Sequence, residues 1–118
     1  MTSQSPKPTV PVVITKHYDL MLWLLQQVPK FPRSHKFVLG DRIQNHALEV
    51  LEHLIEAAYS KHKQEPLKTA GIRMEGLRYL VRCAHDLQLF DQRRYHFIVK
   101  QIDEVGRMIG GWQRAQSA

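Results

Sequence analysis

Four stretches of the chain repeat apolar residues every three or four positions, which is the spacing of one face of a helix. They span about residues 16–28, 34–63, 66–89 and 92–109. No stretch shows the strict alternation of apolar and polar residues that a half-buried strand needs. Because only short breaks separate the four stretches, we predict an all-α fold, an antiparallel up-down-up-down four-helix bundle.

The first stretch has more apolar surface than one neighbouring helix can cover. The residues on the expected core face are Tyr18, Met21, Leu22, Leu25 and Val28. Further apolar residues beside that face are Leu20, Trp23 and Leu24. Thr15 is a suitable N-cap, and Pro29 and Pro32 are expected to end the helix. Three prolines within residues 1–14 disfavour a helix there, so we expect a flexible N-terminal tail.

The second stretch is the longest, and its predicted core seam contains a glycine. The seam residues are Phe37, Gly40, Gln44, Ala47, Leu51, Leu54 and Ala58. A glycine inside a helix costs about 1 kcal/mol relative to alanine. Its presence on the seam therefore indicates that another segment packs closely against Gly40.

The third stretch carries two apolar stripes on different faces. The core seam consists of Ala70, Met74, Leu77, Val81 and Ala84. The second stripe consists of Ile72, Gly76, Tyr79 and Cys83. Because this stripe lies away from the core seam, it predicts a second packing surface, and we take Ile72, Tyr79 and Cys83 as candidate residues of a subunit interface.

The fourth stretch keeps its helical spacing over more than two heptads. Its seam residues are Tyr95, Ile98, Ile102, Val105, Ile109 and Trp112. Asp91 is a suitable N-cap for this helix. The pair Gly110-Gly111 is expected to weaken or end it, so the predicted bundle domain covers residues 15–114 and a C-terminal tail covers residues 115–118.

Composition places few restrictions on function except through charge. The 118 residues suit one domain with a single core, and 17 Lys and Arg against 11 Asp and Glu give a formal net charge of +6. Such a chain attracts polyanions, although many small basic proteins carry this charge for solubility alone. The single cysteine excludes an internal disulfide and a Cys-based zinc finger. No transmembrane stretch or signal peptide is evident, so we expect a cytoplasmic protein that makes no membrane contact.

Arginines are the main candidates for a binding site. The candidate residues are Arg73, Arg78, Arg82, Arg93, Arg94 and Arg107. Arg78 and Arg82 lie one turn apart, with Glu75 and Asp86 as partial acidic partners. Both a solvated face of ion pairs and a phosphate-binding patch fit this pattern. Few aromatic residues interleave with these arginines, so we expect phosphate contacts without base stacking.

Catalytic and metal-binding patterns are weak. Seven histidines include His46 and His53, but no Glu-x-x-His motif of a di-iron bundle occurs. Cys83 is expected to be half-buried, and His85, two positions later on a helix, points elsewhere and cannot act as its base. No phosphate-binding glycine-rich loop is present. We therefore expect no enzyme activity, no metal and no cofactor.

Several ordered motifs together resemble the accessory variability determinant (Avd) proteins of diversity-generating retroelements. The motifs are Tyr18-Asp19-Leu20, Trp23-Leu24-Leu25, Lys30-Phe31-Pro32-Arg33-Ser34, Phe37-Val38-Leu39-Gly40-Asp41-Arg42-Ile43, Leu54-Ile55-Glu56-Ala57-Ala58-Tyr59, Glu104, Gly106-Arg107-Met108 and Gly110-Gly111-Trp112. The resemblance covers about residues 16–114. Wider relatives are the four-helix bundle proteins encoded in intervening sequences of 23S ribosomal RNA.

The resemblance implies a non-enzymatic partner of a reverse transcriptase. Avd-like proteins form basic homopentamers that bind the reverse transcriptase and nucleic acid, RNA or DNA. They support mutagenic retrohoming, in which adenines of a template RNA are miscopied into a variable gene region. Carried over to this chain, the binding role would fall on its surface arginines, first Arg73, Arg78 and Arg82. The alternative is an RNA-associated bundle of the intervening-sequence type that has no reverse transcriptase partner.

Overall fold

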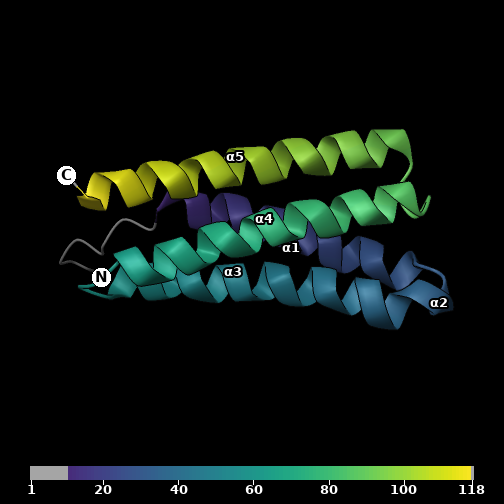
Figure 1. Cartoon of the computed structure of the whole chain (residues 1–118), viewed down its shortest axis with the longest axis horizontal. Helices are drawn as coiled ribbons and strands as arrows, with labels where there is room; N and C mark the ends of the chain where they lie inside the picture. The colour runs from purple at the N-terminus through teal and green to yellow at the C-terminus, as the bar shows by residue number, and fades with distance from the viewer. Residues whose placement is uncertain (1–10, 118) are drawn as a thin grey trace, which may run out of the picture.

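The computed structural model describes residues 11–117, in which four long helices form a bundle (Figure 1). The long helices are α1 (Val12–Gln27), α3 (Asp41–Tyr59), α4 (Gln64–Asp86) and α5 (Gln92–Ser117). Three short turns join α1 to α3, namely the 3-10 turn η1 (Val28–Lys30), α2 (Arg33–His35) and the π turn η2 (Lys36–Gly40). No strand occurs in residues 11–117. The prediction of an all-α four-helix bundle is confirmed.

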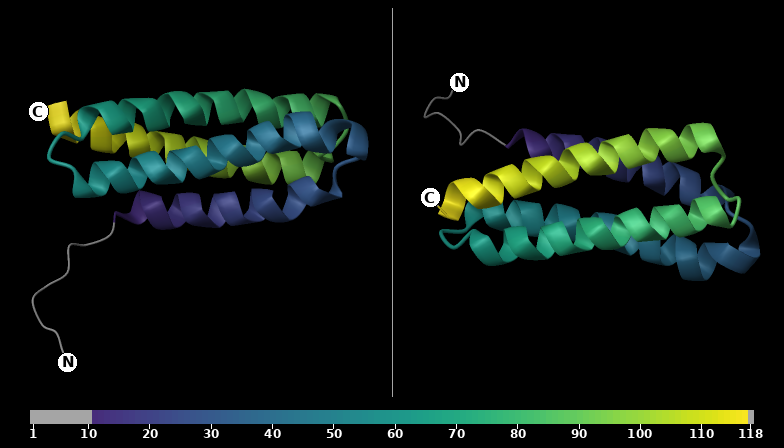
Figure 2. Two further views of the ribbon diagram at one scale, coloured as in Figure 1. Left: turned by 90° about the horizontal axis from the view of Figure 1, so that it is seen from below. Right: turned by 45° about the horizontal axis from the view of Figure 1, so that its top comes forward.

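Each long helix packs against the next one along the chain. Helix α3 lies on α4, α4 lies on α5, and α1 closes the bundle by contacting both α3 and α5. The start of α1 and the end of α5 share one end of the bundle, whereas α2 and the turn between α4 and α5 lie at the other (Figures 1 and 2). This is the up-down-up-down arrangement that short connections favour.

One apolar core runs along the bundle axis. Its fully buried large side chains include Leu20, Leu24, Ile43, Leu54, Leu67, Met74, Leu77, Ile98, Ile102 and Ile109. The seams predicted for α4 and α5 are confirmed, because all their aliphatic residues are buried and Tyr95 and Trp112 pack partly buried against them. Asp91 caps α5 as predicted, since its Oδ1 accepts a hydrogen bond of 2.8 Å from the Arg94 amide.

Helix α1 differs from its prediction in start and in buried face. It begins at Val12 after Pro11, so the prediction of Thr15 as N-cap is wrong. The flexible tail predicted for residues 1–14 is wrong for residues 12–14, which are helical, and its first ten residues lie outside the described part. Proline is tolerated before a helix because the helix does not need its missing N–H. Tyr18 and Leu22 are 48% and 41% exposed, while Leu20 and Leu24 form the core face. A helix apolar on most of its surface does not reveal which side is buried.

The second predicted helix is interrupted near its start. A π turn precedes α3 and shifts the register of the side chains, so that Phe37 is 61% exposed and Leu39 takes its place in the core. The helix also ends at Tyr59, before the predicted end near residue 63. The continuous seam predicted through Phe37 is therefore wrong at its first residue.

Helix α5 continues past the two glycines that were expected to end it. It runs through Gly110 and Gly111 to Ser117, so the predicted C-terminal tail is helical up to that residue, and residue 118 lies outside the described part. Each glycine costs about 1 kcal/mol of helix stability. Ile109 is buried and Trp112 packs against the core, and we attribute the continuation of the helix to these contacts.

Gly40 is a point of close packing, as the sequence indicated. A Cβ atom at Gly40 would lie 2.7 Å from Cγ1 of Val28, a stiff side chain that is itself buried. We expect Gly40→Ala to lower the free energy of unfolding by about 1–3 kcal/mol, measured by urea denaturation. Gly106→Ala is the matched control, because no atom lies within 4 Å of its added Cβ, and it should raise stability by about 0.5–1 kcal/mol. Equal stabilisation by both changes would contradict the contact with Val28.

His17 is a fully buried histidine in the α1–α3 contact. Its Nε2–H donates a hydrogen bond of 2.7 Å to the carbonyl oxygen of Ala47, and its buried Nδ1 has no partner among the described residues. Burial lowers the pKa of His17 below its ordinary value of 6.5, and the bond to Ala47 only partly opposes this shift. His17 is therefore neutral in the folded protein at pH 6.5 and above.

The buried His17 predicts a loss of stability in mild acid. Between pH 6.5 and the lower pKa of the folded state, the unfolded chain protonates this imidazole while the folded chain largely does not. The free energy of unfolding should then fall by at most about 1.4 kcal/mol per pH unit, and no such loss is expected above pH 6.5. Urea titrations at several pH values measure this slope. His17→Gln retains a donor for Ala47 and cannot titrate, so an unchanged slope in this variant would refute the assignment.

Candidate nucleic-acid interface

The outer face of α5 carries a row of exposed basic side chains. Arg93, His96, Lys100 and Arg107 follow one another at intervals of three, four and seven residues, so they share one helical stripe, here called the α5 ridge. Beside it, Glu104 is neutralised by Lys16 of α1 at 2.8 Å. That hydrogen bond is the largest cause of the lowered pKa of Glu104, to which the charge of Arg107 adds.

Two of the predicted site arginines link helices to each other. Arg73 of α4 pairs with Glu49 of α3 at 3.3 Å. Arg78 of α4 pairs with Asp103 of α5 and with Glu75 at 3.4 Å. Burial alone would lower the pKa of Arg78, but its bonds to Asp103 and Glu75 raise it above its ordinary value. These two arginines therefore contribute to helix packing and have less charge available for a ligand.

The other predicted arginines differ in how well they are neutralised. Arg82 is 64% exposed and reaches Asp86 only at 3.9 Å, so solvent screens the pair strongly. Arg94 forms a closer pair with Asp91, at 2.7 Å. Arg93 makes no ion pair within residues 11–117. The expectation of partial acidic partners for Arg78 and Arg82 is confirmed. The most available charge lies on Arg93 and Arg107, which form no ion pair with any described residue, and next on Arg82.

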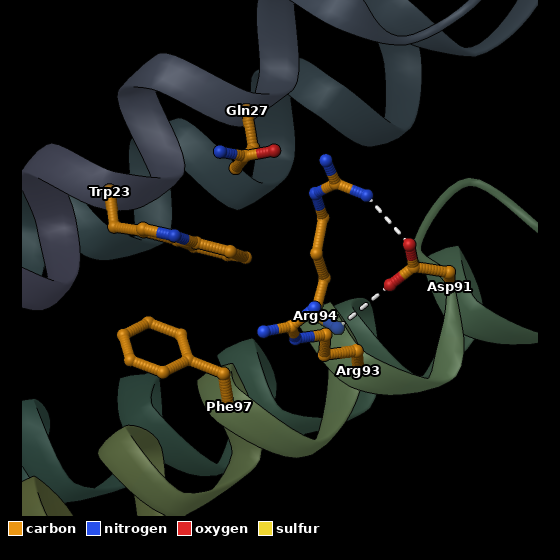
Figure 3. A pocket seen from close by; sticks show the side chains of 6 residues that line it. All are labelled: Trp23, Gln27, Asp91, Arg93, Arg94 and Phe97. Carbon is orange, nitrogen blue, oxygen red and sulfur yellow. Dashed lines mark hydrogen bonds and ion pairs between the residues drawn. The ribbon is translucent and has the colours of Figure 1, made fainter.

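Hollows flank the first turns of α5 on both sides. The α1–α5 hollow, about 520 Å³, is lined by Trp23, Gln27, Asp91, Arg93, Arg94 and Phe97 (Figure 3). The α4–α5 hollow, about 260 Å³, is lined by Arg78, Tyr79, Arg82, Tyr95 and Val99. Both combine arginine with aromatic side chains. The expectation of phosphate contacts without base stacking rested on few aromatic residues interleaving with the arginines along the chain, and this packing removes that premise.

The sequence did not reveal Trp23 as an aromatic neighbour because it comes from a different helix, whereas Tyr79 and Tyr95 directly follow arginines in the chain. Trp23 belongs to α1, and only the contact of α1 with α5 brings it beside Arg93 and Arg94. The signal that was present is Phe97, which lies one turn after Arg93 and is 44% exposed. An exposed phenylalanine next to a basic stripe could have indicated that aromatic and basic side chains share this surface.

Positive charge is concentrated at the end of the bundle where these hollows lie. The segments 28–42 and 82–94, which meet at that end (Figure 1), carry seven Lys and Arg against three Asp and Glu. Phosphate groups would be attracted to this end more strongly than to the middle of the bundle.

Other candidate chemistry is weakly supported by geometry. His46 bonds the Arg42 carbonyl at 3.0 Å, and His53 faces Glu56 at 3.5 Å. No group of three or more potential metal ligands occurs within the described residues.

Cys83 is exposed, so the expectation of a half-buried thiol is wrong. None of the helices described is long and apolar enough to cross a membrane.

The predicted subunit interface lies on an open face of α4. Ile72 and Tyr79 are 63% and 64% exposed, and Cys83 is also exposed. A second exposed apolar stripe runs along α3, through Leu48, Ile55 and Tyr59. Exposed apolar stripes of this kind mark association surfaces. The assignment of either stripe to a subunit contact stays a prediction.

Comparison with known proteins identifies the family. The family model described as bAvd-like matches residues 11–116, nearly the whole chain. The chain therefore belongs to the bAvd-like family, a family of accessory, non-catalytic proteins, and the resemblance read from the sequence motifs is confirmed.

A solved structure supports the fold independently. It is a crystal structure of a protein of unknown function from the S23 ribosomal protein family of Bacteroides thetaiotaomicron, with a TM-score of 0.81 and 14% sequence identity. The match covers 87% of this chain and 96% of the other. At this identity the similarity shows a shared fold. No curated protein matches this chain.

Proposed function

We propose that this protein is a non-enzymatic accessory protein of a diversity-generating retroelement. It binds the reverse transcriptase and the template RNA or DNA, and in this way supports mutagenic retrohoming. The observation that carries the proposal is the bAvd-like match across residues 11–116. In this role the chain needs no catalytic group or cofactor, because the reverse transcriptase supplies the polymerase chemistry.

Nucleic acid binds, in this proposal, at the basic end of the bundle and along the α5 ridge. The support is the available charge of Arg93 and Arg82 together with the exposed Lys100 and Arg107. Contacts to phosphates release counterions, so affinity falls as salt rises. In this proposal Arg73, Arg78 and Arg94 contribute less to phosphate binding, because each forms an ion pair with a carboxylate of the protein.

The proposed assembly is a homo-oligomer, a pentamer as in the Avd resemblance. The α4 stripe of Ile72, Tyr79 and Cys83 is its proposed contact surface, because it is apolar and exposed. Repetition of the basic end around a ring would give several phosphate sites for one strand, which raises affinity through multivalency.

Purification of the tagged protein from its host tests the proposal. We expect the reverse transcriptase of the retroelement to be the main co-purifying protein, identified by mass spectrometry, together with retroelement RNA. A tagged control with the matched charge but an unrelated fold removes non-specific RNA partners. Recovery of the protein without the reverse transcriptase would contradict the proposal.

A second function is favoured by the structural neighbour. The S23 ribosomal protein family of that neighbour fits an RNA-associated bundle of the intervening-sequence type, without a reverse transcriptase partner. In that case the same purification would recover ribosomal RNA fragments and ribosomal proteins. The two functions are therefore separated by the identity of the co-purified protein.

A further inference from the structure

We propose that the α1–α5 hollow binds an unpaired base of single-stranded nucleic acid, stacked on Trp23 and Phe97, with the adjacent phosphate on Arg93. This inference rests on the proposed function, since it specifies how the protein contacts its template. It differs from simple phosphate binding, because it predicts a preference for single strands over duplexes.

Two aromatic side chains, Trp23 and Phe97, line the hollow. Trp23 of α1 and Phe97 of α5 have ring centroids 5.2 Å apart at an interplanar angle of 48°, so the tilted rings contact each other and together line one side of the hollow (Figure 3). Trp23 also contacts the ring of Phe90, with the ring centroids 5.7 Å apart. Phe97 remains 44% exposed. A fixed indole beside an exposed phenyl ring is a suitable stacking platform for a base.

The polar rim favours an anionic, hydrogen-bonding ligand. Asp91 would repel phosphate, but it is neutralised by Arg94 at 2.7 Å and also accepts a hydrogen bond from the Arg94 amide. The positive charge of Arg93 is therefore left for a phosphate, which a guanidinium binds in bidentate fashion. Gln27 faces the hollow from α1, and its amide can both donate to and accept from a base edge (Figure 3).

The combination favours an unpaired nucleotide over the other anionic partners. A base in a duplex has both faces covered by its neighbours, whereas an unpaired base offers a face to an aromatic ring. An acidic peptide would use Arg93 but would gain little from two aromatic faces. The hollow, about 520 Å³, lies in the size range of small-molecule sites and so has room for a nucleotide.

Tryptophan fluorescence provides a direct test, because the chain has only two tryptophans. In the full-length Trp112→Phe protein, emission comes from Trp23 alone. Titration with a single-stranded RNA should quench this emission, since a stacked base lies against the indole. The duplex of the same sequence should bind, as measured by anisotropy of a labelled strand, without comparable quenching.

Phe97→Leu is the test variant, because it keeps an apolar side chain at an exposed position and removes the ring. We expect its affinity for the single strand to fall by about 5- to 100-fold. Tyr59→Leu is the matched control, since it removes a 79% exposed ring from α3 and should bind as the parent does. A single strand with abasic sites should bind both proteins equally weakly.

The outcomes separate this inference from the proposed function. Binding of RNA without quenching of Trp23, or equal affinities of Phe97→Leu and Tyr59→Leu, would overturn the base site but leave phosphate binding intact. Absence of binding to every RNA probe would overturn both. If the Phe97→Leu variant no longer binds the reverse transcriptase but still binds RNA, the hollow is a site for the protein partner. That result would also overturn the inference.

Discussion

Replacement of Arg93, Lys100 and Arg107 together by glutamate is expected to weaken RNA binding by on the order of 100-fold at low salt. All three side chains are exposed on the α5 ridge. Each forms at most a partial ion pair in the fold, so the bundle should remain helical and stable. The dependence of log affinity on log salt should also become shallower, by about 0.7 for each lost phosphate contact with a single strand.

The control for this variant must change the net charge equally. Lys61 and Lys68, together with the neutral residues Thr15 and Asn45, are exposed and lie off the α5 ridge. Their joint replacement by glutamate lowers the net charge by the same amount, but it should affect affinity far less. Anisotropy titrations of both variants at several salt concentrations measure the difference. Equal loss in the two variants would mean that net charge alone, and not the α5 ridge, governs binding.

Arg78 is left out of the ridge variant for a structural reason. Glutamate at this position would face Asp103 and Glu75, which Arg78 neutralises in the folded protein. Any loss of binding could then come from a disturbed α4–α5 contact. The sequence alone favoured Arg78 as a binding residue, and the structure makes Arg82 and Arg93 the better targets.

Introduction of glutamate at Ile72 and Tyr79 is expected to dissociate the proposed assembly into single chains. Burial of a large apolar side chain at an interface contributes about 1.5–3 kcal/mol, and this loss repeats at every subunit contact. A charge in an apolar interface adds a desolvation penalty. Light scattering at micromolar concentration should give the molar mass of an oligomer for the parent and that of a single chain for the variant.

A matched variant tests the competing surface on α3. Leu48 and Ile55 are 38% and 42% exposed, so their replacement by glutamate introduces the same charges on a different face. This variant should keep the mass of the parent. Dissociation by the α3 variant, with an intact α4 variant, would place the subunit contact on α3 and contradict the assignment of Ile72, Tyr79 and Cys83.

The regular parts of the fold were predictable because spacing alone defines them. In α4 the stripe of Met74 and Leu77 is longer and more continuously apolar than the second stripe of Ile72 and Tyr79, so the buried face could be chosen correctly. In α1 apolar residues surround most of the helix, so spacing could not distinguish Leu20 from Tyr18. The π turn before α3 could not be predicted for another reason. One extra residue in a helical turn does not change the spacing of apolar residues enough to be recognised in the sequence.

The candidate site was predictable only in its charges. Arg93 and Arg94 could be named because two adjacent arginines after a turn are visible in the sequence. Their aromatic neighbour Trp23 could not be predicted, because it belongs to another helix and only tertiary packing brings it near the two arginines. The acidic partners across helices, such as Asp103 for Arg78, were hidden in the same way.

The most direct test of the central claim is reconstitution of the accessory complex from purified parts. The protein, its retroelement reverse transcriptase and the template RNA are mixed at low salt and analysed by size-exclusion chromatography with light scattering. The proposal predicts one complex that contains all three components. Elution of the reverse transcriptase apart from this protein, with or without RNA, would contradict it.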